Sequence, residues 1–205
     1  MIAREGVVIL FMLGFISSLL FVLKIYFLAI PCTLFFFFSL YFLRDPRRET
    51  PYGPLDIVSP ADGKILEISE TASTYEISIF MSLLDVHVNR VPYGGVVKSI
   101  ERRGKKFLRA FLKEADFENV QCETHINSPG IADYSVIQIS GIIARRIVNN
   151  LSPEKVVNTG ERMGIILYSS KVKLILPKEK IILKVKPGDR VKGGITLIAE
   201  IKESL

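Results

Sequence analysis

Hydrophobic residues gather at the amino-terminal end of the chain. Residues 7–23 and 25–43 are apolar or small almost throughout, and Lys24 is the single charge between them. As one helix this run would be about 55 Å long, whereas the hydrocarbon core of a bilayer is about 30 Å thick. The pattern therefore predicts two short helices meeting near Lys24, which form a transmembrane helical hairpin and a membrane anchor over residues 1–43.

Basic residues flank both ends of this apolar run. Arg4 precedes it, and Arg44, Arg47 and Arg48 follow it. By the positive-inside rule both ends face the cytoplasm, which predicts a cell-membrane protein with residues 44–205 on the cytoplasmic side. The alternative is a cleaved signal peptide, but no small-x-small cleavage site is followed by polar sequence.

After Pro46 the pattern changes to short β-type runs separated by glycine and proline. We expect strands at residues 56–58, 63–69, 75–81, 95–102, 134–139, 164–168, 171–176, 181–185 and 195–201. Residues 142–149 suit a short helix, and residues 105–115 are ambiguous. Many short strands with few helices predict a β-rich α+β fold, a partly closed β-sandwich or barrel.

The last stretch of the chain is similar to the turn and strand of lipoyl and biotinyl carrier modules. Those modules carry their cofactor on a lysine at the hairpin tip, and neither Lys192 nor Lys202 has the expected neighbours. We therefore interpret residues 185–201 as lipoyl-like hairpin elements with a structural role. Gly188, Gly193 and Gly194 are expected to supply its positive-φ turns.

Composition narrows the possible partners. The formal net charge is +6, which suits an anionic membrane surface or a nucleic acid. No basic run is interleaved with aromatic residues and tryptophan is absent, so a nucleic-acid partner is disfavoured. Two cysteines do not make a disulfide framework, and no metal-ligand spacing is present.

The chain has only two histidines, the residue type best suited to proton transfer near neutral pH. If residues 83–92 form an extended strand, Asp85, His87 and Asn89 share one face, which favours His87 as a site residue. A structural role is the other reading of His87. His125 is interpreted as a loop residue without a partner.

Two further motifs carry candidate chemistry. Asp62 lies in a Pro- and Gly-containing turn, where it either caps the turn or orients a general base. Ser169 and Ser170 lie between two strand-like runs. Such a place suits a strained peptide bond that a neighbouring hydroxyl attacks, although a pair of serines is common in any sequence.

Four sequence blocks occur in order, at residues 43–47, 57–65, 80–92 and 160–172. Together they resemble the phosphatidylserine decarboxylase family in its short, archaetidylserine decarboxylase-like form, found in archaea and bacteria. Residues 139–148 also resemble a family segment. The resemblance implies a carboxy-lyase that converts a serine phospholipid into the ethanolamine phospholipid. The alternatives are a non-catalytic, membrane-anchored lipoyl-like adaptor and an inactive relative.

The resemblance also implies that the proenzyme cleaves itself. The Ser170 oxygen attacks the carbonyl of Ser169, and elimination leaves a pyruvoyl group at residue 170. The products are a β chain of residues 1–169 and an α chain of residues 170–205. The pyruvoyl carbonyl is the cofactor, which forms a Schiff base with the substrate amine and serves as the electron sink. Relatives usually carry glycine where this chain has Ser169, and whether the serine slows cleavage stays open.

The remaining roles also come from the resemblance. His87 positions the substrate carboxylate or returns a proton to Cα, and Asp62 supports self-cleavage. Some relatives carry a second histidine where this chain has Arg90. Arg145 and Arg146 either contact the lipid phosphate or form a solvated helix face. Whether the substrate is a diacyl or an ether-linked lipid stays open, and so does the choice between a monomer and a homo-oligomer.

Overall fold

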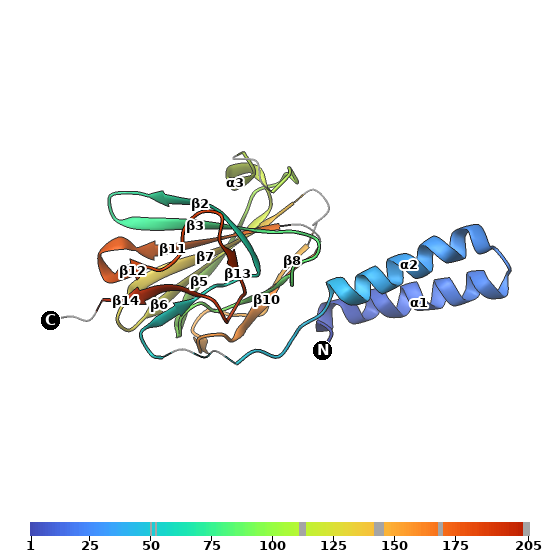
Figure 1. Ribbon diagram of the computed structural model, residues 1–205, viewed down its shortest axis with the longest axis horizontal. Coiled ribbons are helices and arrows are strands. Elements are labelled where there is room, and N and C mark those ends of the chain that lie inside the picture. Colours follow the sequence, from blue (N-terminus) through green and yellow to red (C-terminus); the bar gives the residue numbers. More distant parts are fainter. Residues whose placement is uncertain (50, 52, 111–113, 142–145, 168–169, 203–205) are drawn as a thin grey trace. The chain divides into compact units, whose positions relative to one another are not determined.

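The computed structural model describes residues 1–205 except 50, 52, 111–113, 142–145, 168–169 and 203–205. It contains two compact units, Met1–Arg47 and Arg48–Leu205. The first unit is a pair of helices and the second unit is built mainly from strands (Figure 1).

Two antiparallel helices make up the first unit, α1 (Val7–Val22) and α2 (Tyr26–Phe42). Lys24 lies in the connection with a φ of 59°, so the predicted pair of short helices meeting near Lys24 is confirmed. The hydroxyls of Ser17 and Thr33 hydrogen-bond between the helices at 2.6 Å. Within the described residues, one helical stretch, Arg4–Val22, is long and apolar enough to cross a membrane, and α2 is shorter.

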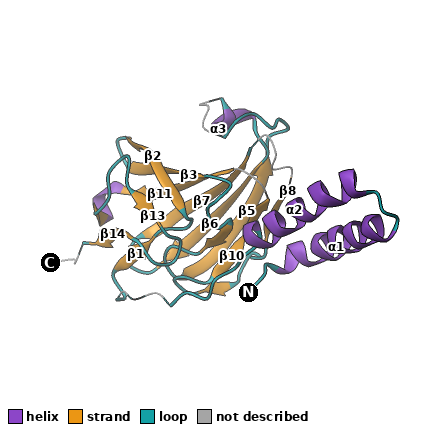
Figure 2. Ribbon diagram, turned by 45° about the vertical axis from the view of Figure 1, so that its right-hand side comes forward, coloured by secondary structure: helices purple, strands orange, loops and turns teal. Residues whose placement is uncertain are grey.

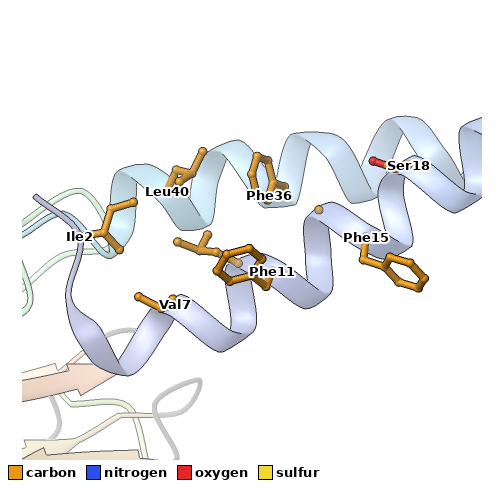
Figure 3. Close-up of a pocket in the computed structure, with 9 residues that line it drawn as sticks. Ile2, Val7, Phe11, Phe15, Ser18, Phe36 and Leu40 are labelled. Atoms are coloured by element: carbon orange, nitrogen blue, oxygen red, sulfur yellow. The ribbon is translucent and has the colours of Figure 1, made fainter.

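The helix pair presents apolar side chains outward. A groove of about 510 Å³ opens along it, with Phe11 and Phe15 from α1 and Phe36 and Leu40 from α2 in its walls (Figure 3). Ser18 is the one polar side chain among its lining residues. Exposed apolar surface of this extent is unusual in water and marks an interaction surface.

The second unit is built on an antiparallel sheet of eight strands that curls into a half-barrel (Figure 2). Its strand order is β13 (Arg190–Val191), β2 (Gly63–Glu70), β3 (Thr74–Met81), β11 (Ser170–Pro177), β7 (Ala132–Ser140), β6 (Gln121–Ser128), β5 (Gly95–Arg103) and β9 (Val156–Val157). Two three-stranded sheets complete it: β4 (Val88–Arg90), β10 (Arg162–Leu167) and β8 (Arg146–Asn149), with β10 in the middle, and β1 (Asp56–Val58), β14 (Leu197–Ile201) and β12 (Ile181–Leu183), with β14 in the middle.

Alternating apolar residues on the central strands form the hydrophobic core. Ile79 of β3, Val172 of β11 and Val136 of β7 are fully buried, and Ile166 of β10 packs into the same cluster. Branched side chains at every second position suit a strand with one buried face. The prediction of a β-rich, partly closed fold is confirmed at this level.

Several local predictions are wrong. The helix expected at residues 142–149 is a strand where the structure describes it, because Arg146–Asn149 forms β8 beside β10; residues 142–145 lie outside the described residues. The ambiguous stretch, residues 105–115, contains only the first residue of the helix α3 (Ala115–Glu118). Gly188 and Gly194 have the expected positive φ, but Gly193 does not.

Candidate active site

Ser170 is the first residue of β11, between β3 and β7, and it is fully buried. It lies opposite Met81 on β3 and opposite Ser140 on β7, so the three side chains share one face of the sheet. Its hydroxyl donates to the Met81 sulfur at 3.3 Å. A thioether only accepts, so this contact leaves the lone pairs of the Ser170 oxygen available for attack. Ser169, the other predicted cleavage residue, lies outside the described residues.

A buried polar cluster surrounds Ser170 on this inner face. Gln138 lies opposite Val172, two residues along β11, and therefore also faces inward. Its amide donates to the side-chain oxygen of Asn89 at 2.8 Å, and the Asn89 amide in turn points to the Met81 sulfur at 3.7 Å. The sequence interpretation missed Gln138 and Ser140. Their signal was two polar residues that alternate with the apolar Ile137 and Ile139 at the end of a predicted strand.

His87 is fully buried just before β4, two residues from Asn89. Its Nδ1 lies 3.0 Å from the carbonyl oxygen of Asp85, and a carbonyl can only accept. Nδ1 therefore carries the proton in the neutral ring, and Nε2 carries the lone pair that a general base needs. The structure thus places the predicted His87 beside the Ser170 cluster through its neighbour Asn89.

The predicted common face of Asp85, His87 and Asn89 is wrong. The strand begins only at Val88, and Asp85 lies in the preceding turn. There its carboxylate accepts from the backbone N–H and the hydroxyl of Ser82, at 2.8 and 2.6 Å. Asp85 caps the turn, and it is the Asp85 backbone that orients the imidazole.

Asp62 lies beside the start of β2, and Arg48 and Gly193 hold its carboxylate. Arg48 makes a two-pronged ion pair with it, and the Gly193 N–H donates to it at 2.8 Å. A Cβ on the next residue, Gly63, would lie 2.1 Å from the Phe80 carbonyl oxygen, so only glycine fits there. This close approach keeps Asp62 at the sheet end that also holds Ser170.

The sheet register sets the separation of Asp62 and Ser170. Lys64 and Lys171 both pair with Phe80, so β2 and β11 lie on either side of β3. At about 4.8 Å per strand, the two backbones are about 10 Å apart. The described contacts of the Asp62 carboxylate are therefore with Arg48 and Gly193 rather than with Ser170 or His87.

An ion network covers the opposite, outer face of the sheet. The Lys171 side chain, next to Ser170 in the chain, is buried and pairs with Asp116 of α3. Lys173 also reaches Asp116, at 3.4 Å, and it pairs with Glu76 at 3.1 Å. We call these four side chains the outer-face ion network. It joins β11 to β3 and to α3 directly after the predicted cleavage point.

The other predicted residues lie apart from this cluster. Arg145 is outside the described residues, and Arg146 is exposed on β8. Arg90 donates to the carbonyl of Gly160 at 3.1 Å. The loop prediction for His125 is wrong, because His125 lies in β6 and its Nδ1 is 2.8 Å from the Ser135 hydroxyl.

The inner-face cluster fits a reactive carbonyl at residue 170. Within the part of the chain that the structure describes, the buried Ser140 hydroxyl and the Gln138 side-chain oxygen have no hydrogen-bond partner. Such atoms next to a buried residue 170 suit a site that holds a polar reacting group. Among the same described residues, no cluster of histidine, cysteine and carboxylate side chains suits a metal ion.

Comparison with known proteins shows the family to which the chain belongs. The family model for phosphatidylserine decarboxylase matches residues 35–199. The relative from Carboxydothermus hydrogenoformans, a phosphatidylserine decarboxylase proenzyme, is 39% identical, over 97% of this chain and 96% of its own length. The proenzyme from Syntrophus aciditrophicus is also 39% identical, over 94% of each chain, and the one from Ehrlichia chaffeensis is 39% identical, over 99% of this chain.

These matches place the chain among the decarboxylases, which are carboxy-lyases. The chain belongs to the phosphatidylserine decarboxylase family, and the resemblance seen in the four sequence blocks is confirmed.

Proposed function

We propose that this protein is a self-processing decarboxylase that releases CO2 from the head group of a serine phospholipid and leaves the ethanolamine phospholipid. One observation carries the proposal: a fully buried serine at the start of a central strand, whose hydroxyl donates only to a thioether among the described contacts. The names of the relatives, all phosphatidylserine decarboxylase proenzymes, agree with it.

Self-cleavage begins when the Ser170 oxygen attacks the carbonyl carbon of Ser169. The peptide C–N bond breaks and an ester to the Ser170 oxygen forms. Loss of the Ser170 Cα proton then breaks the Cβ–O bond, which frees residues 1–169 with a terminal carboxylate. Water replaces the nitrogen of the remaining dehydroalanine, ammonia leaves, and the chain of residues 170–205 begins with a pyruvoyl group. The His87 Nε2, opposite the Nδ1 that contacts the Asp85 carbonyl, is suited to accept the proton in the first step.

The pyruvoyl group supplies the electron sink for the negative charge that CO2 leaves behind on Cα. The protein supplies position and protons. His87, buried next to the cluster, holds the carboxylate or returns a proton to Cα. Asp62, fixed by Arg48, supports self-cleavage by holding the β2 end of the sheet in place.

We assign residues 1–43 to a membrane-anchoring hairpin and residues 44–205 to the catalytic domain on its cytoplasmic side. The apolar outer surface of α1 and α2 and the groove in Figure 3 suit contact with lipid chains. The anchor keeps the site at the bilayer surface, where a two-tailed substrate resides. Contact of Arg145 and Arg146 with the lipid phosphate, the lipoyl-like character of the carboxyl-terminal elements and homo-oligomer formation stay predictions.

The mass of the purified full chain tests the proposal. We expect two fragments, the smaller one of residues 170–205, with no free amino group and a carbonyl that borohydride reduces. Ser170→Ala should remain one chain of 205 residues and should not decarboxylate phosphatidylserine. Ser78→Ala, on the adjacent strand β3, is the matched control and should be processed normally. Normal fragmentation of Ser170→Ala refutes the assignment, and an unprocessed wild type supports the adaptor or the inactive relative.

A further inference from the structure

Two buried polar atoms beside residue 170 have no role in self-cleavage as described above. They are the Ser140 hydroxyl, directly opposite Ser170, and the Gln138 side-chain oxygen, one inward position further along β7. Both residues are fully buried, and neither atom has a partner within the described residues. Leaving such atoms unpaired costs free energy, so their retention in a core strand calls for a partner that arrives later.

The neighbouring contacts determine what these atoms offer. The Gln138 amide nitrogen is committed to Asn89 at 2.8 Å, so its free end is an acceptor. Asn89 is fixed in turn by the Met81 sulfur. Ser140 can donate as well as accept, because its backbone N–H, rather than its hydroxyl, donates to the Val120 carbonyl. The inner face therefore presents one acceptor and one hydroxyl donor toward the side of β11 that holds residue 170.

We propose that Gln138 and Ser140 bind the serine head group of the substrate. This inference rests on the proposed function. The acceptor of Gln138 takes an N–H of the substrate amine, and the Ser140 hydroxyl donates to the substrate carboxylate. Asn89 is a positioning residue that holds the Gln138 amide. Self-cleavage makes room at this point, because the hydroxyl oxygen and the nitrogen of Ser170 both leave residue 170.

The two contacts can be separated with two lipids. Phosphatidylserine carries the amine and the carboxylate, whereas phosphatidylethanolamine carries only the amine. With phosphatidylcholine vesicles containing phosphatidylserine, Ser140→Ala should raise KM by about ten- to a hundred-fold. Competitive inhibition by phosphatidylethanolamine should stay unchanged in that variant. Gln138→Leu should weaken the binding of phosphatidylserine and of phosphatidylethanolamine by similar factors.

Processing and stability are measured on the same samples. Ser140→Ala removes a hydroxyl without a described partner, so we expect normal fragments and an unchanged Tm. Ser135→Ala is the matched control: it lies on the same strand with its hydroxyl bonded to His125, and its KM should match the wild type. An unchanged KM in Ser140→Ala overturns the inference. So does an equal loss for both lipids, or a block of fragmentation. A wild type that is never processed defeats the proposed function instead.

Discussion

We expect Asp116→Asn, which breaks the outer-face ion network, to lower the free energy of unfolding. The Lys171 and Asp116 side chains are 4% and 16% exposed, so the substitution leaves a buried ammonium without its carboxylate. Lys173 keeps Glu76 at 3.1 Å, but Lys171 has no second carboxylate among its described ion pairs. Removing one partner of a buried pair costs about 3–5 kcal/mol. The lower end applies here because Asp116 is partly solvated, which predicts a loss of about 3 kcal/mol and a Tm lower by about 10 °C.

The assay is thermal unfolding of the full chain in detergent. It is run in the Ser170→Ala background so that every molecule has the same covalent form. Asp133→Asn is the matched control: Lys98 and Asp133 lie 3.0 Å apart but are 53% and 60% exposed, so this pair should contribute less than about 1 kcal/mol. Lys171→Met should cost less than Asp116→Asn, because Asp116 retains Lys173. If Asp116→Asn lowers Tm no more than Asp133→Asn, the network does not stabilise β11 and the reasoning is wrong.

Two further predictions concern the histidine and the buried thiol. His87→Ala should lower the release of CO2 from phosphatidylserine by about a hundred- to ten-thousand-fold, while His125→Ala on the sheet surface leaves it unchanged; full turnover in His87→Ala would remove this imidazole from the mechanism. Burial raises the pKa of the Cys122 thiol, so near neutral pH its thiolate fraction is reduced. Iodoacetamide should therefore label Cys122 far more slowly in the native protein than in urea, and equal rates would contradict the buried position.

The strands with regular apolar alternation could be predicted from the sequence. The run over 171–176 becomes the middle of β11, which lies between β3 and β7. Its inward valine and leucine side chains belong to the hydrophobic core. The helix pair was also predictable, since apolar length alone dictates it. Ser170 was selected through the family resemblance of its sequence block, and His87 through its local pattern together with that resemblance; both are buried.

Strands whose burial depends on distant partners could not be predicted. β6 has few apolar residues, because its inward face includes Cys122 and Thr124, which meet Asn149 of β8. Two of the three residues of β4 are polar, yet the strand is buried, because it pairs with β10 and because Gln138 and Met81 contact the Asn89 side chain. Likewise, no local sequence pattern predicts that Asp116 pairs with Lys171, which lies 55 positions later in the chain. These contacts arise from the tertiary fold, which overrides local propensity.

The position of β11 inside the eight-stranded sheet has a consequence for the mature protein. Residues 170–205 provide β11 between β3 and β7, and they also supply β12, β13 and β14 to two different sheets. With the proposed cut before residue 170, the short chain therefore still pairs with strands of the long chain in both of these sheets. Neither piece owns a complete core, so dilution alone should not release the short chain. Dissociation and global denaturation should be one and the same event.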